Sequence, residues 1–138
     1  MLLDTHALFW LVSGLQPISD DALLAVGESQ RSGRLFVSPV SAWELSLAIR
    51  KPNDAPVLGD ISVANWFRSA IRATSAKVVA INQTIALEAA HVVEATGHKD
   101  PGDCFLIATA RTKQVSLITR DKAIRRLSGQ DFLSVVVC

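Results

Sequence analysis

Several acidic residues of this chain lie where a strand is expected to end or a helix is expected to begin. The sequence holds only 13 aspartates and glutamates, yet four of them follow an expected strand or open an expected helix: Asp4, Glu44, Asp103 and Asp121. In an open parallel sheet the carboxyl ends of the strands share one edge, and ligands bind there. We therefore expect these four carboxylates to converge on one cleft, with Asp100 beside them.

A group of carboxylates of this kind needs a counter-charge. Packed carboxylates repel one another and burial raises their pKa values, so a cation or protons must neutralise the cluster. The chain supplies oxygen ligands without a cluster of cysteines and histidines, which suits Mg²⁺ or Mn²⁺. These ions commonly bridge to substrate phosphates, so the pattern points to phosphodiester chemistry.

Each of these acids also has a structural interpretation, because acids in a first helical turn are stabilised by the helix dipole. Ser41-Ala42-Trp43-Glu44 fits a capping box, which would place Glu44 in a first turn with a purely structural role. Asp103 and Asp121 have similar helix-start explanations. Asp4, at the end of a buried apolar strand, has no evident cap or dipole role, which favours a function for it.

Short apolar runs alternate with helical patterns along the chain, and the segment 51–60 is the longest loop. This alternation predicts an α/β fold with a parallel sheet covered by helices on both faces. In the helix expected at 84–96, the spacing of Leu87, Ala90 and His91 predicts that they face the core. Strands are expected at 1–5, 35–38, 77–81, 115–119 and 134–137, and helices at 6–12, between the Ser19 cap and Gly33, and at 41–50, 62–74, 84–96, 103–111 and 122–127.

The bulk composition fits one compact domain over residues 1–138, since 49% of the 138 residues are apolar and 20% are charged. A net charge of +1 excludes a strongly cationic surface, so any nucleic-acid binding needs a local basic patch.

Cys104 and Cys138 match neither a metal-ligand spacing nor a disulfide framework, which favours a reducing cytoplasm. No apolar run is long enough to span a membrane, and the N-terminus lacks the basic flank of a secretory signal.

Several segments carry a resemblance to a known family. They are Leu2-Leu3-Asp4-Thr5-His6, Ser41-Ala42-Trp43-Glu44, His98-Lys99-Asp100-Pro101-Gly102-Asp103 with Ile107-Ala108-Thr109-Ala110, and Leu117-Ile118-Thr119-Arg120-Asp121. In their order and spacing they resemble PIN-domain ribonucleases, specifically the VapC-type toxins of bacterial toxin–antitoxin pairs. The match extends over essentially the whole chain.

The resemblance implies a fold and an activity. The fold is a three-layer α/β/α sandwich with a five-stranded parallel sheet. The activity is that of a Mg²⁺- or Mn²⁺-dependent endoribonuclease, usually dimeric and held inactive by a cognate antitoxin. Asp4, Glu44, Asp103 and Asp121 become the catalytic acidic quartet, and Asp100 a nearby auxiliary acid. The chain departs from the common family pattern at Gly102, where similar proteins carry another apolar residue, and at Cys104, where they carry arginine.

On this interpretation, Asp4, Asp103 and Asp121 hold the metal, which orients water for in-line attack on an RNA phosphate. Glu44 positions the metal or the water, and Thr5 and Thr119 add hydroxyl contacts. Around the cleft, the basic residues next to Asp121 are the best candidates for RNA-phosphate contacts; they are Arg120 and Lys122. His6 and His98 are expected to be packed or hydrogen-bonded and not to act as proton donors.

Two other functions fit part of the pattern. One is a phosphatase or phosphoacceptor domain with Asp4 as nucleophile, although His6 stands where a dehalogenase-like site would carry a second aspartate. The other is a non-catalytic module whose acids cap helices and whose apolar face binds a protein. Metal binding and RNA cleavage would separate the nuclease from the binding module.

Overall fold

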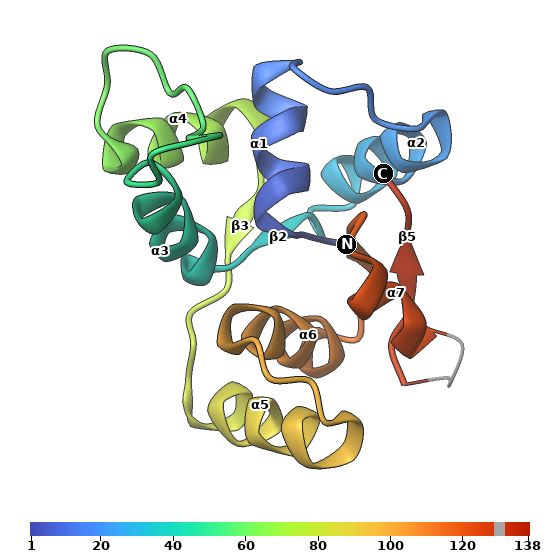
Figure 1. Ribbon diagram of the computed structural model, residues 1–138. Helices are drawn as coiled ribbons and strands as arrows, with labels where there is room; N and C mark the ends of the chain where they lie inside the picture. Colours follow the sequence, from blue (N-terminus) through green and yellow to red (C-terminus); the bar gives the residue numbers. More distant parts are fainter. Residues whose placement is uncertain (129–131) are drawn as a thin grey trace.

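The computed structural model describes residues 1–128 and 132–138. Within these residues, short strands alternate with longer helices (Figure 1). The strands are β1 (Leu2–Leu3), β2 (Phe36–Val37), β3 (Lys77–Val78), β4 (Leu117–Ile118) and β5 (Val135–Val136). The helices are α1 (Thr5–Ser13), α2 (Asp20–Arg31), α3 (Pro39–Ala48), α4 (Val63–Thr74), α5 (Gln83–Thr96), α6 (Pro101–Lys113) and α7 (Lys122–Ser128).

The strands form one parallel sheet in the order β3-β2-β1-β4-β5. The chain builds outward from β1 through β2 to β3, then returns to the other side of β1 to add β4 and β5. Leu2 pairs with Leu117 and Leu3 with Ile118, so the ends of β1 and β4 are in register. The order of the strands therefore reverses between β1 and β4, and crevices form beyond the strand ends at such a point.

Side chains of β1, β2, β4 and β5 alternate between two apolar cores. Leu3, Val37 and Ile118 pack with α1, α2, α3 and α4 on one face. Their neighbours Leu2 and Leu117 pack with α5, α6 and α7 on the other face. Figure 1 shows α5 and α6 lying together on the side of the sheet opposite α1, α3 and α4. This arrangement confirms the predicted three-layer α/β/α sandwich.

The strands are shorter than the sequence patterns predicted, and the helices that follow β1, β2 and β3 begin one or two residues sooner. The α3 helix starts at Pro39 and not at Ser41, since the Ser38 side chain accepts a hydrogen bond from the Val40 amide at 3.2 Å and proline suits the first helical position. The α6 helix likewise starts at Pro101, two residues before the expected start at Asp103. Lys77 and Val78 of β3 are both exposed, as suits a strand at the edge of the sheet.

The buried face of α5 also differs from the expected one. Ile85, Ala89 and Val92 are buried, whereas Leu87 is 64% exposed and His91 is exposed. Both sets have helical spacing, so periodicity alone did not separate them. Among the described residues, no helix is long and apolar enough to cross a membrane.

Candidate active site

Asp4 joins the central strand to the helix that follows it. The residue is 5% exposed, and its Oδ1 accepts a hydrogen bond from the Ala7 amide at 2.6 Å, which caps α1. The expectation that Asp4 has no capping role is therefore wrong; the helix begins one residue after it. Burial raises the pKa of the Asp4 carboxyl, while hydrogen bonds from the Thr119 hydroxyl and the Ala7 amide lower it in part.

Glu44 lies in the second turn of α3, because Ser38 and not Ser41 is the N-cap. The capping-box interpretation is therefore wrong, and Ser41 is instead fully buried, with its hydroxyl 3.0 Å from the Thr5 hydroxyl that donates to it. The same Thr5 hydroxyl lies against Glu44 Oε2 in a short hydrogen bond. Burial raises the pKa of Glu44, the Thr5 hydroxyl lowers it, and the charges of Asp103 and Asp100 raise it.

The start of α6 carries two further carboxylates. Asp100 caps the helix by accepting the Asp103 amide at 3.1 Å, and Asp103 lies in the first turn as predicted. His98 Nε2 lies 2.8 Å from Asp103 Oδ2, so His98 is hydrogen-bonded as expected and fixes the rotamer of that acid. Burial raises the pKa of Asp103, the hydrogen bond from His98 lowers it, and the charge of Asp100 raises it.

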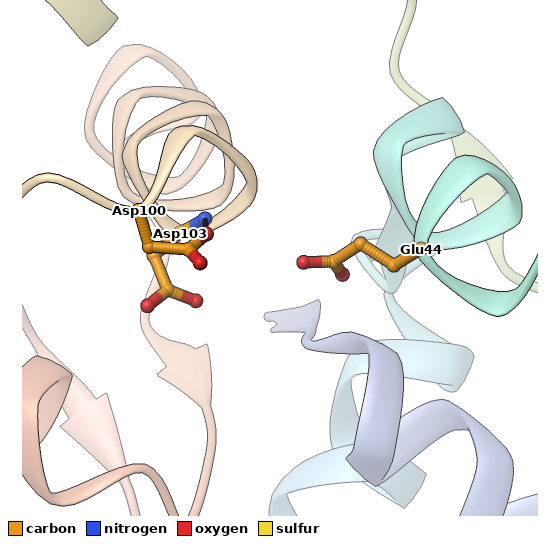
Figure 2. Close-up of side chains that lie close together, drawn as sticks. All are labelled: Glu44, Asp100 and Asp103. Carbon is orange, nitrogen blue, oxygen red and sulfur yellow. Dashed lines mark hydrogen bonds between the residues drawn. The ribbon is translucent and has the colours of Figure 1, made fainter. Parts of the chain in front are cut away.

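Three of these carboxylates come close enough to share one ion. One oxygen each from Glu44, Asp100 and Asp103 can be chosen so that all lie within 4.8 Å of one another. Figure 2 shows the Glu44 side chain reaching from α3 toward the two aspartates at the start of α6. Gly102, between the two aspartates in sequence, is buried where α6 faces Glu44.

Asp121 approaches the site from the other side of β1. Its Oδ1 accepts the amides of Ala123 at 2.7 Å and Ile124 at 3.0 Å, and its own amide donates to the buried Thr119 hydroxyl at 3.0 Å. The predicted helix-start role of Asp121 is confirmed by these bonds. Thr119 thereby links Asp121 to Asp4 across the ends of β4 and β1.

All five acids line one cleft of about 560 Å³, together with Thr5. The prediction grouped Asp4, Asp103 and Asp121 as metal ligands, whereas the tightest group in the structure is Glu44, Asp100 and Asp103. The donor set consists of carboxylate oxygens, which suits a hard divalent cation such as Mg²⁺ or Mn²⁺. The raised pKa values fit the same interpretation, because a bound cation would offset the cost of burying these charges.

The two predicted RNA-contacting cations lie beside this cleft. Arg120 and Lys122 line a smaller hollow of about 430 Å³ that also contains Asp4 and Asp121. The Arg120 guanidinium donates to the backbone oxygens of Pro17 and Cys138, and its Cζ lies 4.4 Å from the centre of the Trp10 ring. Arg120 is thus held in place by the protein, while Lys122 is exposed.

Sequence reasoning assigned no role in the site to Trp43 or Gly102. Trp43 is 52% exposed and lines the cleft beside Glu44. Gly102 is identified from the sequence only as a departure from the family pattern, yet its contact with the acidic cluster makes it part of the site. The signal for Gly102 was a glycine inside a helix, where that residue is disfavoured unless something approaches closely.

Comparison with known proteins gives a family and a fold. A family model described as PIN domain matches residues 1–130. A toxin–antitoxin complex from Klebsiella pneumoniae superposes with a TM-score of 0.63 at 21% identity, covering 98% of this chain and 94% of that one. VapBC2 from Rickettsia felis, bound to a DNA fragment from its promoter, gives 0.69 at 11% identity over 99% and 97% of the two chains. FitAcB from Neisseria gonorrhoeae gives 0.59 at 18% identity over 97% and 94%. No curated protein sequence matches this chain significantly.

Proposed function

Because the chain belongs to the PIN domain family, whose members are generally nucleases, we propose that it is a Mg²⁺- or Mn²⁺-dependent endoribonuclease and the toxin of a toxin–antitoxin pair. The observation that carries this proposal is the cleft itself. Four separate segments of the chain each contribute an acid to one hollow at the carboxyl edge of the sheet. These acids are Asp4, Glu44, Asp100 with Asp103, and Asp121, and Asp54 of the loop between α3 and α4 also lines the cleft.

Helix capping alone does not account for this arrangement. Asp4, Asp100 and Asp121 each accept backbone amides at a helix start. Glu44 caps no helix, and its carboxylate is partly withdrawn from water in a site where two other acids raise its pKa. A module that used its acids only as caps would gain nothing from that placement, so the cluster favours the nuclease over a non-catalytic binding module.

The residues of the site have different proposed roles in metal binding. Asp103, Glu44 and Asp100 are the nearest set for a divalent ion, and Asp4 and Asp121 extend the negative surface along the cleft. When bound, such an ion would neutralise charge at a phosphate and would orient and acidify a bound water. Around it, His98 orients Asp103, Thr5 orients Glu44, and Thr119 orients Asp4.

The substrate and partner follow from the same proposal. Arg120 and Lys122 would meet RNA phosphates where the smaller hollow joins the acids. Two of the solved structures that this fold resembles are named as a toxin–antitoxin complex and as VapBC2. On that basis, we expect a cognate antitoxin to bind this chain and block the cleft. We also propose that the chain forms a homodimer, as the resemblance to VapC-type toxins implies.

The deciding experiment is RNA cleavage by purified, antitoxin-free protein. Total cellular RNA is incubated with and without Mn²⁺ and the cut sites are mapped. We expect cleavage that needs the metal and that Asp4→Asn abolishes, while Asp21→Asn, an exposed acid of α2, leaves it unchanged. Cleavage by Asp4→Asn at the wild-type rate would refute the assignment of the site.

The toxin role is tested separately in growing cells. Induced expression of the wild-type chain should arrest growth, expression of Asp4→Asn should not, and co-expression of the cognate antitoxin should restore growth. Growth arrest that persists with Asp4→Asn would show that the effect does not come from this cleft.

A further inference from the structure

Gly102 occupies an unusual position for a glycine. It lies in the first turn of α6, it is buried, and it is not among the glycines with positive φ, so its backbone conformation is open to any residue. Alanine favours helix over glycine at such a position. The reason for glycine must therefore lie in the space around it and not in the backbone.

That space is filled by the acidic cluster. A Cβ at position 102 would lie 3.0 Å from Glu44 Cδ, closer still to Glu44 Oε1, and 3.2 Å from Asp100 Oδ1. Contacts as short as those to Glu44 are not sustained by real Cβ atoms, so the glutamate would have to move. The carboxylate of Glu44 therefore packs directly on the bare backbone of α6.

We propose that Gly102 is a positioning residue for metal binding, because it lets the Glu44 carboxylate lie against α6 and join Asp100 and Asp103 as a third ligand. This inference rests on the proposed function, since it assumes that the carboxylates hold a divalent ion. It adds that, in this chain, the Glu44 carboxylate reaches the two aspartates through space that a side chain at position 102 would fill.

The surroundings of Glu44 determine what a larger residue at position 102 would do. The displaced atoms are the end of a flexible side chain, so the helix and the sheet need not move. The other oxygen of Glu44 is held by the Thr5 hydroxyl on the side of α1. Because a methyl group at position 102 would occupy the space of Glu44 Oε1, the carboxylate would have to move away from α6 and so away from Asp100 and Asp103 at the start of that helix.

The test compares two helical glycines. Gly102→Ala adds a methyl group against Glu44, whereas Gly27→Ala adds one in α2, where a Cβ would meet only Arg31 Nη1 at an ordinary 3.7 Å. Mn²⁺ binding to the metal-stripped proteins is measured by isothermal titration calorimetry, and folding by thermal unfolding in chelator. We expect Gly102→Ala to weaken Mn²⁺ binding about 10-fold or more without lowering the unfolding temperature. Gly27→Ala should bind Mn²⁺ as the wild type does.

A double substitution establishes whether the effect passes through Glu44. In a Glu44→Ala background the methyl group has no carboxylate to displace, so adding Gly102→Ala should weaken Mn²⁺ binding no further. A further loss in that background would assign the effect to Asp100 and overturn the inference. Wild-type Mn²⁺ affinity in the Gly102→Ala single variant would overturn it as well.

The outcomes separate this inference from the proposed function. Saturable Mn²⁺ binding that depends on Gly102, with no RNA cleavage, would support the positioning role and refute the nuclease. RNA cleavage by the wild type together with unchanged Mn²⁺ binding by Gly102→Ala would refute only the positioning role. A wild-type protein that binds no Mn²⁺ would refute both.

Discussion

Asp4 combines a structural and a proposed catalytic role, and Asp4→Asn separates them. An asparagine keeps a side-chain oxygen that can accept the Ala7 amide, which Asp4 Oδ1 accepts at 2.6 Å. It removes the charge of a carboxyl that is 5% exposed and whose pKa is raised by burial. The substitution therefore retains the cap of α1 and removes the cost of a buried charge.

The sign of the stability change follows from the direction of the pKa shift. Because the carboxyl has a higher pKa when folded than when unfolded, the folded state binds more protons, and ionisation costs stability above the ordinary pKa of 3.8. At neutral pH without metal, Asp4→Asn should therefore be at least as stable as the wild type. Asp4→Ala also removes the charge but loses the cap, worth about 1 kcal/mol, so it should unfold roughly 4 °C below Asp4→Asn.

Metal reverses the order of wild type and Asp4→Asn. An ion that binds only the folded protein stabilises it by about 2.7 kcal/mol when its free concentration is about 100 times its dissociation constant. The wild type should gain this stability from Mn²⁺, whereas Asp4→Asn should gain less. Thermal unfolding followed by circular dichroism at pH 7.5, in chelator and in Mn²⁺, measures both effects. An Asp4→Asn protein that is less stable than Asp4→Ala in chelator would refute the reasoning on the cap.

Three further predictions concern two residues of the cleft region and one control ion pair outside it. Glu44→Gln should stabilise the metal-free protein more at pH 8 than at pH 5. Because the pKa of Glu44 is raised in the folded protein, ionising this carboxyl lowers the free energy of unfolding of the wild type as the pH rises above the ordinary pKa of 4.5. Urea unfolding at both pH values measures the difference. His98→Ala removes the 2.8 Å bond to Asp103 and should weaken Mn²⁺ binding about 10-fold in calorimetry; unchanged affinity would exclude an orienting role. Arg111→Met removes the ion pair with Glu88, far from the cleft, and should lower the free energy of unfolding by about 1 kcal/mol in urea titrations while leaving Mn²⁺ affinity unchanged.

The order of elements and the position of most acids were predictable from the sequence. Apolar runs alternating with helical patterns indicate a parallel sheet with two helical layers, and the sheet and its two cores have that form. Asp4 and Asp121 follow β1 and β4, whose register brings the ends of both strands together. The element order and the placement of these two acids follow from the topology of the sheet, which depends on sequence patterns extending over many residues.

The details of the cluster were not predictable, because they depend on where single helices begin. Ser38 and Ser41 are both plausible N-caps in the sequence, and the choice moves Glu44 by almost a full turn relative to the start of α3. Proline at position 39 suits a helix start as well as a strand end, so the local pattern did not decide between them. Likewise, only tertiary packing brings Gly102 against Glu44, which precedes it by 58 residues.

Helix capping does not prevent a carboxylate from binding a metal ion. Asp4, Asp100 and Asp121 each use Oδ1 to accept backbone amides. A carboxylate has two oxygens with about four acceptor sites, so a cap leaves capacity for a cation and also fixes the orientation of the group. The bonds at the helix starts therefore do not count against a metal-binding role. They hold three acids in place before any ion arrives, and Glu44, which lacks such a bond, depends on Thr5 and on the bare backbone at Gly102 for the same purpose.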